Sequence, residues 1–172
     1  TTTMSMTLNP VNEAAFQKAV QSLETLNRAA VFHPTGTGKS CIAWKVVEAH
    51  PQTTFFWLVA GAQRLALRQA ELTRYNGGTL PGNVRFCDCE KLAAATPEQW
   101  VRLGEQKPGC IVLDCYHELS AVCWAQSVQK LLRMCPQAKV LGLGVPNGAP
   151  VCAAAQELFA DCIVSHMTVA EA

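Results

Sequence analysis

The sequence contains no long hydrophobic run and no signal peptide. No stretch of apolar residues reaches the ~20 that a helix needs to cross a bilayer. The first ten residues, "TTTMSMTLNP", lack the basic and then apolar pattern of a secretory signal. We predict that residues 1–10 are a disordered tail or a remnant left by cloning, followed by one domain over residues 11–172. These absences argue against a membrane protein.

A strong excess of charge of either sign is also missing. The 172 residues include 14 Lys and Arg and 13 Asp and Glu, which gives a net charge of +1. Such a chain has no overall basic field, so any contact with nucleic acid must be local or supplied by another domain. Charged residues make up only 16% of the sequence and hydrophobic residues 49%, as expected for a compact domain rather than a disordered chain.

The nine cysteines lack the spacing of a metal site. They form no C-x-x-C pair, and no histidine lies at ligand spacing from them, so no zinc is expected. Their odd number and their places in apolar segments indicate reduced thiols, acting as small core residues in a cytoplasmic protein. Cys87 and Cys89 are predicted to be two free thiols, because a disulfide across that spacing would be strained. Trp57, Trp100 and Trp124 are expected in the core rather than as stacking platforms for bases.

What the sequence does contain is an alternation of helical and strand-like segments. A helix is predicted to begin at Thr96, with Pro97 in its first turn and Gln99 closing a capping box. Further helices are predicted over residues 11–28, 39–49, 62–76, 120–134 and 152–159. Strands are predicted over residues 29–32, 54–60, 84–89, 110–114, 139–144 and 161–166. Continuous apolar strands that alternate with helices indicate an α/β fold: a three-layer parallel sheet with helices on both faces. In such sheets ligands bind beyond the carboxyl ends of the strands.

Residues 33–40, "HPTGTGKS", lie between a predicted strand and a predicted helix. Glycines allow the backbone to wrap closely around a phosphate, and the helix N-terminus offers backbone N–H groups and a partial positive charge. Lys39 would reach the β- and γ-phosphates, and the Ser40 hydroxyl would ligate Mg²⁺. The first glycine of the usual G-x-x-x-x-G-K-[ST] pattern is replaced by His33. The alternative is a glycine-rich turn with a chance lysine, but the strand before it and the helix after it favour a nucleotide site.

This loop and four further segments, one before it and three after it, occur in an order that resembles a known family. "PTGTGKS" resembles motif I of superfamily 2 helicases, and "LVAGAQRLALRQ", "LDCYHE" and "LGLGVPNGAP" resemble motif Ia, the D-E-x-H box and motif III. "FQKAV" resembles the upstream segment whose glutamine reads adenine, which makes Gln17 the candidate. The resemblance spans about residues 11–172 and implies the first RecA-like domain of a DEAD/DEAH-box protein, a P-loop NTPase that binds ATP and Mg²⁺. It implies triphosphate contacts from Thr35, Gly36, Thr37, Gly38, Lys39 and Ser40, metal contacts from Ser40 and Asp114, and catalytic roles for Lys39, Asp114 and His117.

Two of these motifs depart from the family pattern. The glutamate that activates the attacking water is replaced by Cys115, and loss of a general base typically costs on the order of 10²–10⁴ in rate. Residues 144–146 (Gly-Val-Pro) replace the hydroxyl-bearing Ser-Ala-Thr of motif III. We therefore expect a helicase or translocase domain with weakened turnover, and little or no ATPase activity in isolation. The alternative is an inactive scaffold with a helicase fold; a small P-loop kinase is less favoured because no arginine-rich lid segment is evident.

The resemblance also implies partners. A second RecA-like domain, which supplies arginine fingers in the family, is absent from this sequence, so the chain is expected to be part of a longer one. The expected substrate of the whole protein is nucleic acid, with DNA favoured over RNA. Arg64 and Arg68 could contact a nucleic-acid backbone or belong to a solvated helix face.

Overall fold

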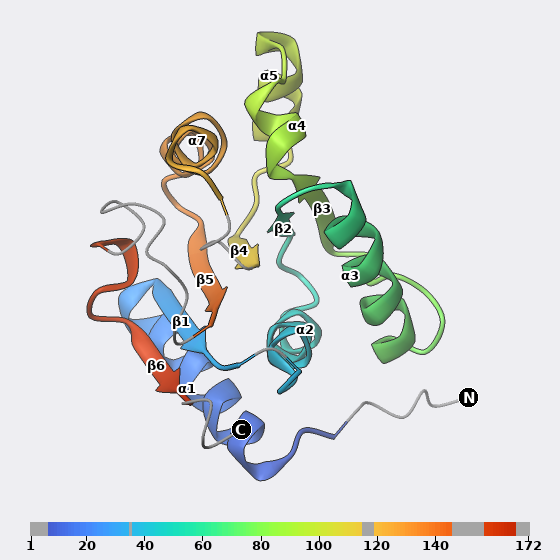
Figure 1. The fold of residues 1–172 in the computed structure, drawn as a ribbon, viewed down its shortest axis with the longest axis vertical. Helices are drawn as coiled ribbons and strands as arrows, with labels where there is room; N and C mark the ends of the chain where they lie inside the picture. Colours follow the sequence, from blue (N-terminus) through green and yellow to red (C-terminus); the bar gives the residue numbers. More distant parts are fainter. Residues whose placement is uncertain (1–6, 35, 115–118, 146–156, 168–172) are drawn as a thin grey trace.

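The computed structural model describes residues 7–34, 36–114, 119–145 and 157–167. All six of its strands are parallel and form one sheet in the order β3-β2-β4-β5-β1-β6 (Figure 1). The strands are β1 Arg28–Phe32, β2 Phe55–Val59, β3 Val84–Asp88, β4 Cys110–Asp114, β5 Lys139–Gly144 and β6 Ile163–His166. The helices are α1 Pro10–Leu26, α2 Lys39–Ala49, α3 Ala62–Tyr75, α4 Cys89–Ala93, α5 Pro97–Glu105, α6 Ala121–Cys123, η2 Trp124–Gln129 and α7 Lys130–Met134.

Helices cover both faces of the sheet, because successive strand residues point to opposite sides. In β2, Phe55 and Trp57 belong to a core cluster with residues of α1, α2 and α3, whereas Phe56 and Leu58 belong to a second cluster with residues of α5, η2 and α7. Figure 1 shows α1, α2 and α3 on one side of the sheet and α4, α5 and α7 on the other. The predicted three-layer α/β fold with a parallel sheet is confirmed.

The carboxyl ends of β1, β5 and β4 lie at one edge of the sheet. Phe32 at the end of β1 pairs with Gly144 of β5, and Asp114 at the end of β4 pairs with Leu143 of β5. The glycine-rich loop follows β1 and leads into α2, and α2 packs beside α3. This arrangement brings the loop and Asp114 to the same edge, with only β5 between their strands.

Several predicted boundaries are close to those of the structure. Helix α2 and strand β5 have the predicted bounds, and the capping box at Thr96 and Gln99 is present. The first helix ends at Leu26, earlier than expected, because Asn27 adopts a left-handed conformation with φ 63°. The strand predicted over 84–89 ends at Asp88, because the Asp88 carboxylate accepts from the Glu90 N–H at 2.9 Å and caps the short helix α4.

The helix predicted over residues 120–134 is present from Ala121 to Met134, but its π-helical middle was not predicted. The structure has α6, then the six-residue π-helix η2, then α7. Within η2 the Ser127 hydroxyl donates to the Cys123 carbonyl oxygen at 2.6 Å, as the Thr25 and Thr73 hydroxyls do to the carbonyls four residues back in the regular helices α1 and α3. Most of the helix predicted over 152–159 lies outside the described residues.

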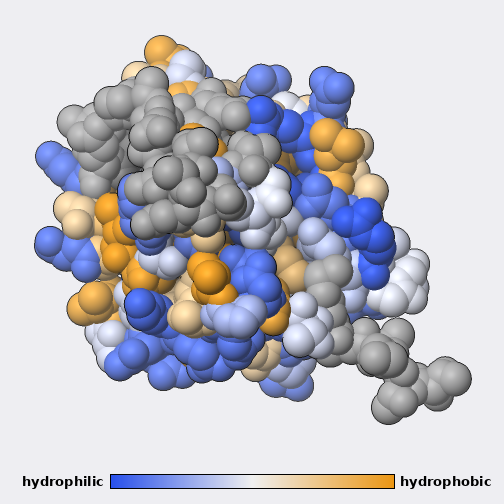
Figure 2. All heavy atoms as spheres, turned by 60° about the horizontal axis from the view of Figure 1, so that its bottom comes forward, coloured by the Kyte–Doolittle hydropathy of each residue, from blue (hydrophilic) through white to orange (hydrophobic). Residues whose placement is uncertain are grey.

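The core contains the predicted tryptophans and most of the described cysteines. Trp57, Trp100 and Trp124 are all buried, which confirms their core placement. The seven cysteines among the described residues form no disulfide, and burial raises the pKa of Cys87 and of Cys110 to about 12. On the face shown in Figure 2 hydrophobic side chains are interspersed with hydrophilic ones. None of the helices in the described ranges is long and apolar enough to span a membrane.

Candidate functional site

The glycine-rich loop turns tightly between β1 and α2. Gly36 and Gly38 have φ angles of +84° and +92°, a conformation that residues with a side chain rarely adopt. The Thr37 hydroxyl donates to the Pro34 carbonyl oxygen at 2.7 Å and closes the turn. Gly38 is the N-cap of α2, so Lys39 and Ser40 form the first turn of an eleven-residue helix. The loop therefore presents the N-terminus of α2, with its partial positive charge, at the sheet edge.

Asn12 of α1 supports this loop, and sequence reasoning missed it. Its amide Nδ2 donates to the Thr37 carbonyl oxygen at 2.8 Å, while its Oδ1, which is buried, has no hydrogen-bond partner among the described residues. A Cβ at Gly38 would lie 2.9 Å from Asn12 Nδ2, so the close approach of α1 requires glycine there. The sequence signal was the helix start at Pro10: the Asn9 side chain caps α1 and places Asn12 in the first turn.

His33 replaces the first glycine of the usual pattern and ties the loop to β6. Its side chain is 0% exposed, and its Nε2 lies 2.7 Å from the Ser165 hydroxyl. Burial lowers the pKa of His33, and the positive charge of Lys39 and then His166 lower it further. The Lys39 ammonium donates to the His33 carbonyl oxygen at 2.7 Å. The predicted phosphate-binding lysine thus lies folded along its own loop.

Asp114 lies buried at the end of β4 with hydrogen bonds to both carboxylate oxygens. The Trp57 indole N–H donates to Oδ2 at 2.9 Å, and the Arg68 guanidinium donates through Nε to Oδ2 and through Nη2 to Oδ1, the latter at 3.2 Å. The Asp114 side chain is 1% exposed and that of Arg68 is 22% exposed. Arg68 therefore forms a bidentate ion pair with a buried carboxylate. The sequence predicted instead that Arg68 contacts nucleic acid or lies on a solvated helix face.

Ser40 joins the same network through Glu71 of α3. The Ser40 hydroxyl donates to Glu71 Oε2 at 2.8 Å, and Arg68 Nη1 donates to the same oxygen at 2.9 Å. The Tyr75 hydroxyl also donates to Glu71 Oε2, at 3.4 Å. Burial would raise the pKa of Glu71, but the Ser40 hydrogen bond and the charge of Arg68 outweigh it and lower the pKa. Burial would likewise lower the pKa of Arg68, but the charges of Asp114 and Glu71 raise it.

The residues predicted to ligate Mg²⁺ do not fit the ion as they are arranged. Mg²⁺ needs oxygen ligands in near-octahedral geometry. Both oxygens of Asp114 accept hydrogen bonds from a guanidinium, and the Ser40 hydroxyl donates to a carboxylate. Within the described ranges no group of three or more His, Cys, Asp or Glu side chains could hold a metal ion. Magnesium at Ser40 and Asp114 stays a prediction that this arrangement does not favour.

The other predicted site residues are not all part of this arrangement. Gln17 lies on the exposed surface of α1 and donates to Glu13 Oε1 at 3.0 Å, whereas Asn12 on the same helix faces the loop. Arg64 of α3 is exposed. Thr35, Cys115 and His117 lie outside the described residues, as does Pro146. Gly144 ends β5, and its carbonyl oxygen accepts from the His33 N–H at 3.1 Å, which links the end of β5 to the start of the loop.

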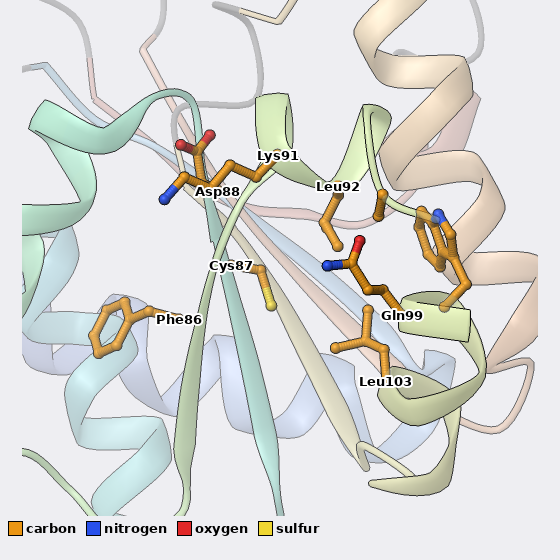
Figure 3. A pocket seen from close by; sticks show the side chains of 9 residues that line it. Phe86, Cys87, Asp88, Lys91, Leu92, Gln99 and Leu103 are labelled. Carbon is orange, nitrogen blue, oxygen red and sulfur yellow. The ribbon is translucent and has the colours of Figure 1, made fainter. Parts of the chain in front are cut away.

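A separate hollow of about 260 Å³ lies at the outer strand β3 (Figure 3). Cys87 points into it, opposite Leu92, Gln99 and Leu103 of the α4–α5 region, while Phe86 lies on the other side of the strand. None of the residues predicted to bind nucleotide lines this hollow. It is therefore distinct from the site at the end of β1.

Comparison with solved structures gives a match over most of the chain. An ATP-dependent Type ISP restriction-modification enzyme, LlaBIII bound to DNA, superimposes with a TM-score of 0.58 and 15% sequence identity. The two share a fold. The match covers 83% of this chain but only 13% of that enzyme's chain, so this chain spans a small part of its length. No family model matches the sequence, and no curated protein matches it.

Proposed function

We propose that this chain is the RecA-like ATP-binding domain of a DEAD/DEAH-box-like helicase or nucleic-acid translocase. The observation that carries the proposal is the loop between β1 and α2, where two positive-φ glycines and Lys39 lie at the N-terminus of a helix. This geometry is suited to a phosphate chain, because backbone N–H groups and the helix dipole favour negative charge there. The solved enzyme with the same fold is ATP-dependent and bound to DNA, which favours ATP and DNA as the ligands.

The proposed roles follow from the residues at the loop. Thr35, Gly36, Thr37 and Gly38 would wrap the β- and γ-phosphates, and Lys39 would leave the His33 carbonyl to neutralise them. Gln17, five residues beyond Asn12 on α1, would read adenine. In the whole protein a second RecA-like domain would complete the cleft. The protein would act in the cytoplasm, where thiols stay reduced, and the seven cysteines in the described part of the chain form no disulfide.

Turnover by this domain would be slow. Cys115 replaces the glutamate that activates water, and a thiol offers one weak acceptor where a carboxylate offers two strong ones. His117, in the same segment, is the remaining candidate for a catalytic side chain. We therefore expect the chain to bind ATP and, without its second domain, to hydrolyse little of it.

Binding of a fluorescent ATP analogue tests the proposal. Binding in the micromolar to millimolar range is expected for the native chain, and Lys39→Met should weaken it at least ~tenfold, as loss of a charge-assisted contact costs about 1.5–3 kcal/mol. Lys91→Met is the matched control, because Lys91 is exposed on α4, across the sheet from the loop. Binding that survives Lys39→Met unchanged would show that the nucleotide, if it binds, uses another site.

The second candidate function is an inactive scaffold with a helicase fold, and the buried Arg68–Asp114 pair favours it. A carboxylate bound to an internal guanidinium is not available to a reaction in this arrangement. Steady-state ATPase measurements on the longest native chain, with and without DNA or RNA, distinguish the two functions. Nucleic-acid-stimulated hydrolysis that Asp114→Asn abolishes would rule out the scaffold.

A further inference from the structure

We propose that the guanidinium of Arg68 takes the place of the divalent cation in this site, so that the site binds a nucleoside triphosphate without Mg²⁺. The nucleotide part of this inference rests on the proposed function; the part concerning Arg68 and the cation does not.

The first argument is that Arg68 occupies the oxygens that a metal would use. Hard cations bind carboxylate and hydroxyl oxygens. Here the guanidinium bonds three carboxylate oxygens: Oδ1 and Oδ2 of Asp114 at the end of β4, and Oε2 of Glu71 on α3. The Ser40 hydroxyl is drawn into the same cluster as a donor to Glu71. One cation already bridges the acidic groups at this edge of the sheet.

The second argument concerns charge. Arg68 brings one positive charge to the two negative charges of Asp114 and Glu71, which lowers the net charge of the three groups from −2 to −1. A divalent ion at Asp114 would lie beside the guanidinium and be repelled by it, unless Arg68 moved out. Mg²⁺ also gives up its water reluctantly, which weakens it further as a competitor for a carboxylate that is 1% exposed.

The third argument is that Arg68 is held from several sides. The guanidinium of Arg68 donates to Asp114 through Nε and Nη2, and to Glu71, one turn later on α3, through Nη1. Glu71 is fixed in turn by the hydroxyls of Ser40 and Tyr75. Displacing Arg68 would break all three of its bonds and leave the buried Asp114 carboxylate with the Trp57 indole alone, among the bonds described. A planar fork suits such two-carboxylate contacts better than an ammonium does.

Manganese binding in the absence of nucleotide tests the cation argument directly. Free Mn²⁺ is measured by electron paramagnetic resonance with the native chain, Arg68→Gln and Arg68→Lys. Arg102→Gln, at an exposed position of α5, is the control. The native chain and the control should bind no Mn²⁺ at concentrations up to about 1 mM, the range of weak protein cation sites, whereas Arg68→Gln should bind at least ~tenfold more tightly. Arg68→Lys keeps the charge and should bind as weakly as the native chain.

Two results would overturn the proposal: Mn²⁺ binding by the native chain as tight as by Arg68→Gln, or no gain of binding in a folded Arg68→Gln. If that variant does not fold, as judged by circular dichroism, the native chain and Arg68→Lys are compared instead. Both should bind Mn²⁺ equally weakly, and Mn²⁺ binding by the native chain below about 1 mM would overturn the proposal.

Binding of the fluorescent ATP analogue to the native chain, in Mg²⁺ and in EDTA, tests the nucleotide part. The two dissociation constants should agree within about twofold, a difference below 0.5 kcal/mol. A requirement for Mg²⁺ would overturn the substitution by Arg68. No binding in either condition would refute the proposed function and with it metal-free nucleotide binding, while the Mn²⁺ result would still decide whether Arg68 holds the cation's place.

Discussion

Replacement of Arg68 by methionine should destabilise the protein by about 3 kcal/mol. Removing one partner of a buried ion pair costs about 3–5 kcal/mol, because the other charge is left uncompensated. We expect the lower end of that range, since Arg68 is 22% exposed and the Trp57 indole still donates to Asp114 at 2.9 Å. An exposed ion pair, in contrast, contributes only about 0.2–1 kcal/mol. The free energy of unfolding from urea titrations at pH 7 measures the difference.

A double-mutant cycle separates the ion pair from other effects of the substitution. Asp114→Asn removes the carboxylate charge but keeps an oxygen that can accept from Trp57. The coupling energy between Arg68→Met and Asp114→Asn should be about 2 kcal/mol, within the range for residues in direct contact. Arg102→Met, at an exposed position of α5, should change stability by no more than about 0.5 kcal/mol. A cost below about 1 kcal/mol for Arg68→Met would refute the reasoning, because the pair would then behave like a surface pair.

Three further predictions concern the loop and the core. Because folding lowers the pKa of His33, the imidazole of the unfolded state is protonated first as the pH falls. The free energy of unfolding should therefore decrease below about pH 6.5, by at most about 1.4 kcal/mol per pH unit. His33→Gln should flatten this slope in urea titrations. Gly38→Ala should cost at least about 1–2 kcal/mol, since φ is +92° and the new Cβ would lie 2.9 Å from Asn12 Nδ2; a neutral effect on the thermal midpoint would contradict this conformation. Gly142→Ala should cost about 1–3 kcal/mol, because its Cβ would lie 2.6 Å from Phe159 Cζ, and Phe159→Leu should restore part of the loss, whereas no restoration would place the clash elsewhere.

The layers of the fold could be predicted because the sequence signals are local. Apolar runs such as "FFWLV" and "CIVLD" give strands buried on both faces, and Thr96 with Gln99 supplies a complete helix start. The π-helical turn could not be predicted in the same way, since Ser127 is compatible with an ordinary helix: its bond to the carbonyl four residues back has counterparts at Thr25 in α1 and Thr73 in α3. Cys89 was assigned to the strand because the capping role of Asp88 depends on where the next helix begins.

The candidate site was predictable in its parts but not in its contacts. The glycines and Lys39 follow β1, and Asp114 ends β4, as the motifs indicated. That Arg68 reaches Asp114 depends on two facts that no local pattern contains: β2 pairs with β4, and α3, which follows β2, packs beside α2. For the same reason Arg68 was expected to face solvent or nucleic acid, although it lies in a buried network.

The rate at which the buried thiols react with alkylating reagents would report how often the protein opens locally. Alkylating reagents attack the thiolate, and a cysteine whose pKa is raised to about 12, such as Cys110 in the central strand β4, is almost entirely protonated at neutral pH. Cys87 in the outer strand β3 has the same raised pKa, but it points into the hollow beside α4 and α5. Modification of Cys110 therefore requires β4 to separate from its neighbours, and its labelling rate, followed by mass spectrometry, would report how often the central strand becomes accessible, without any introduced probe.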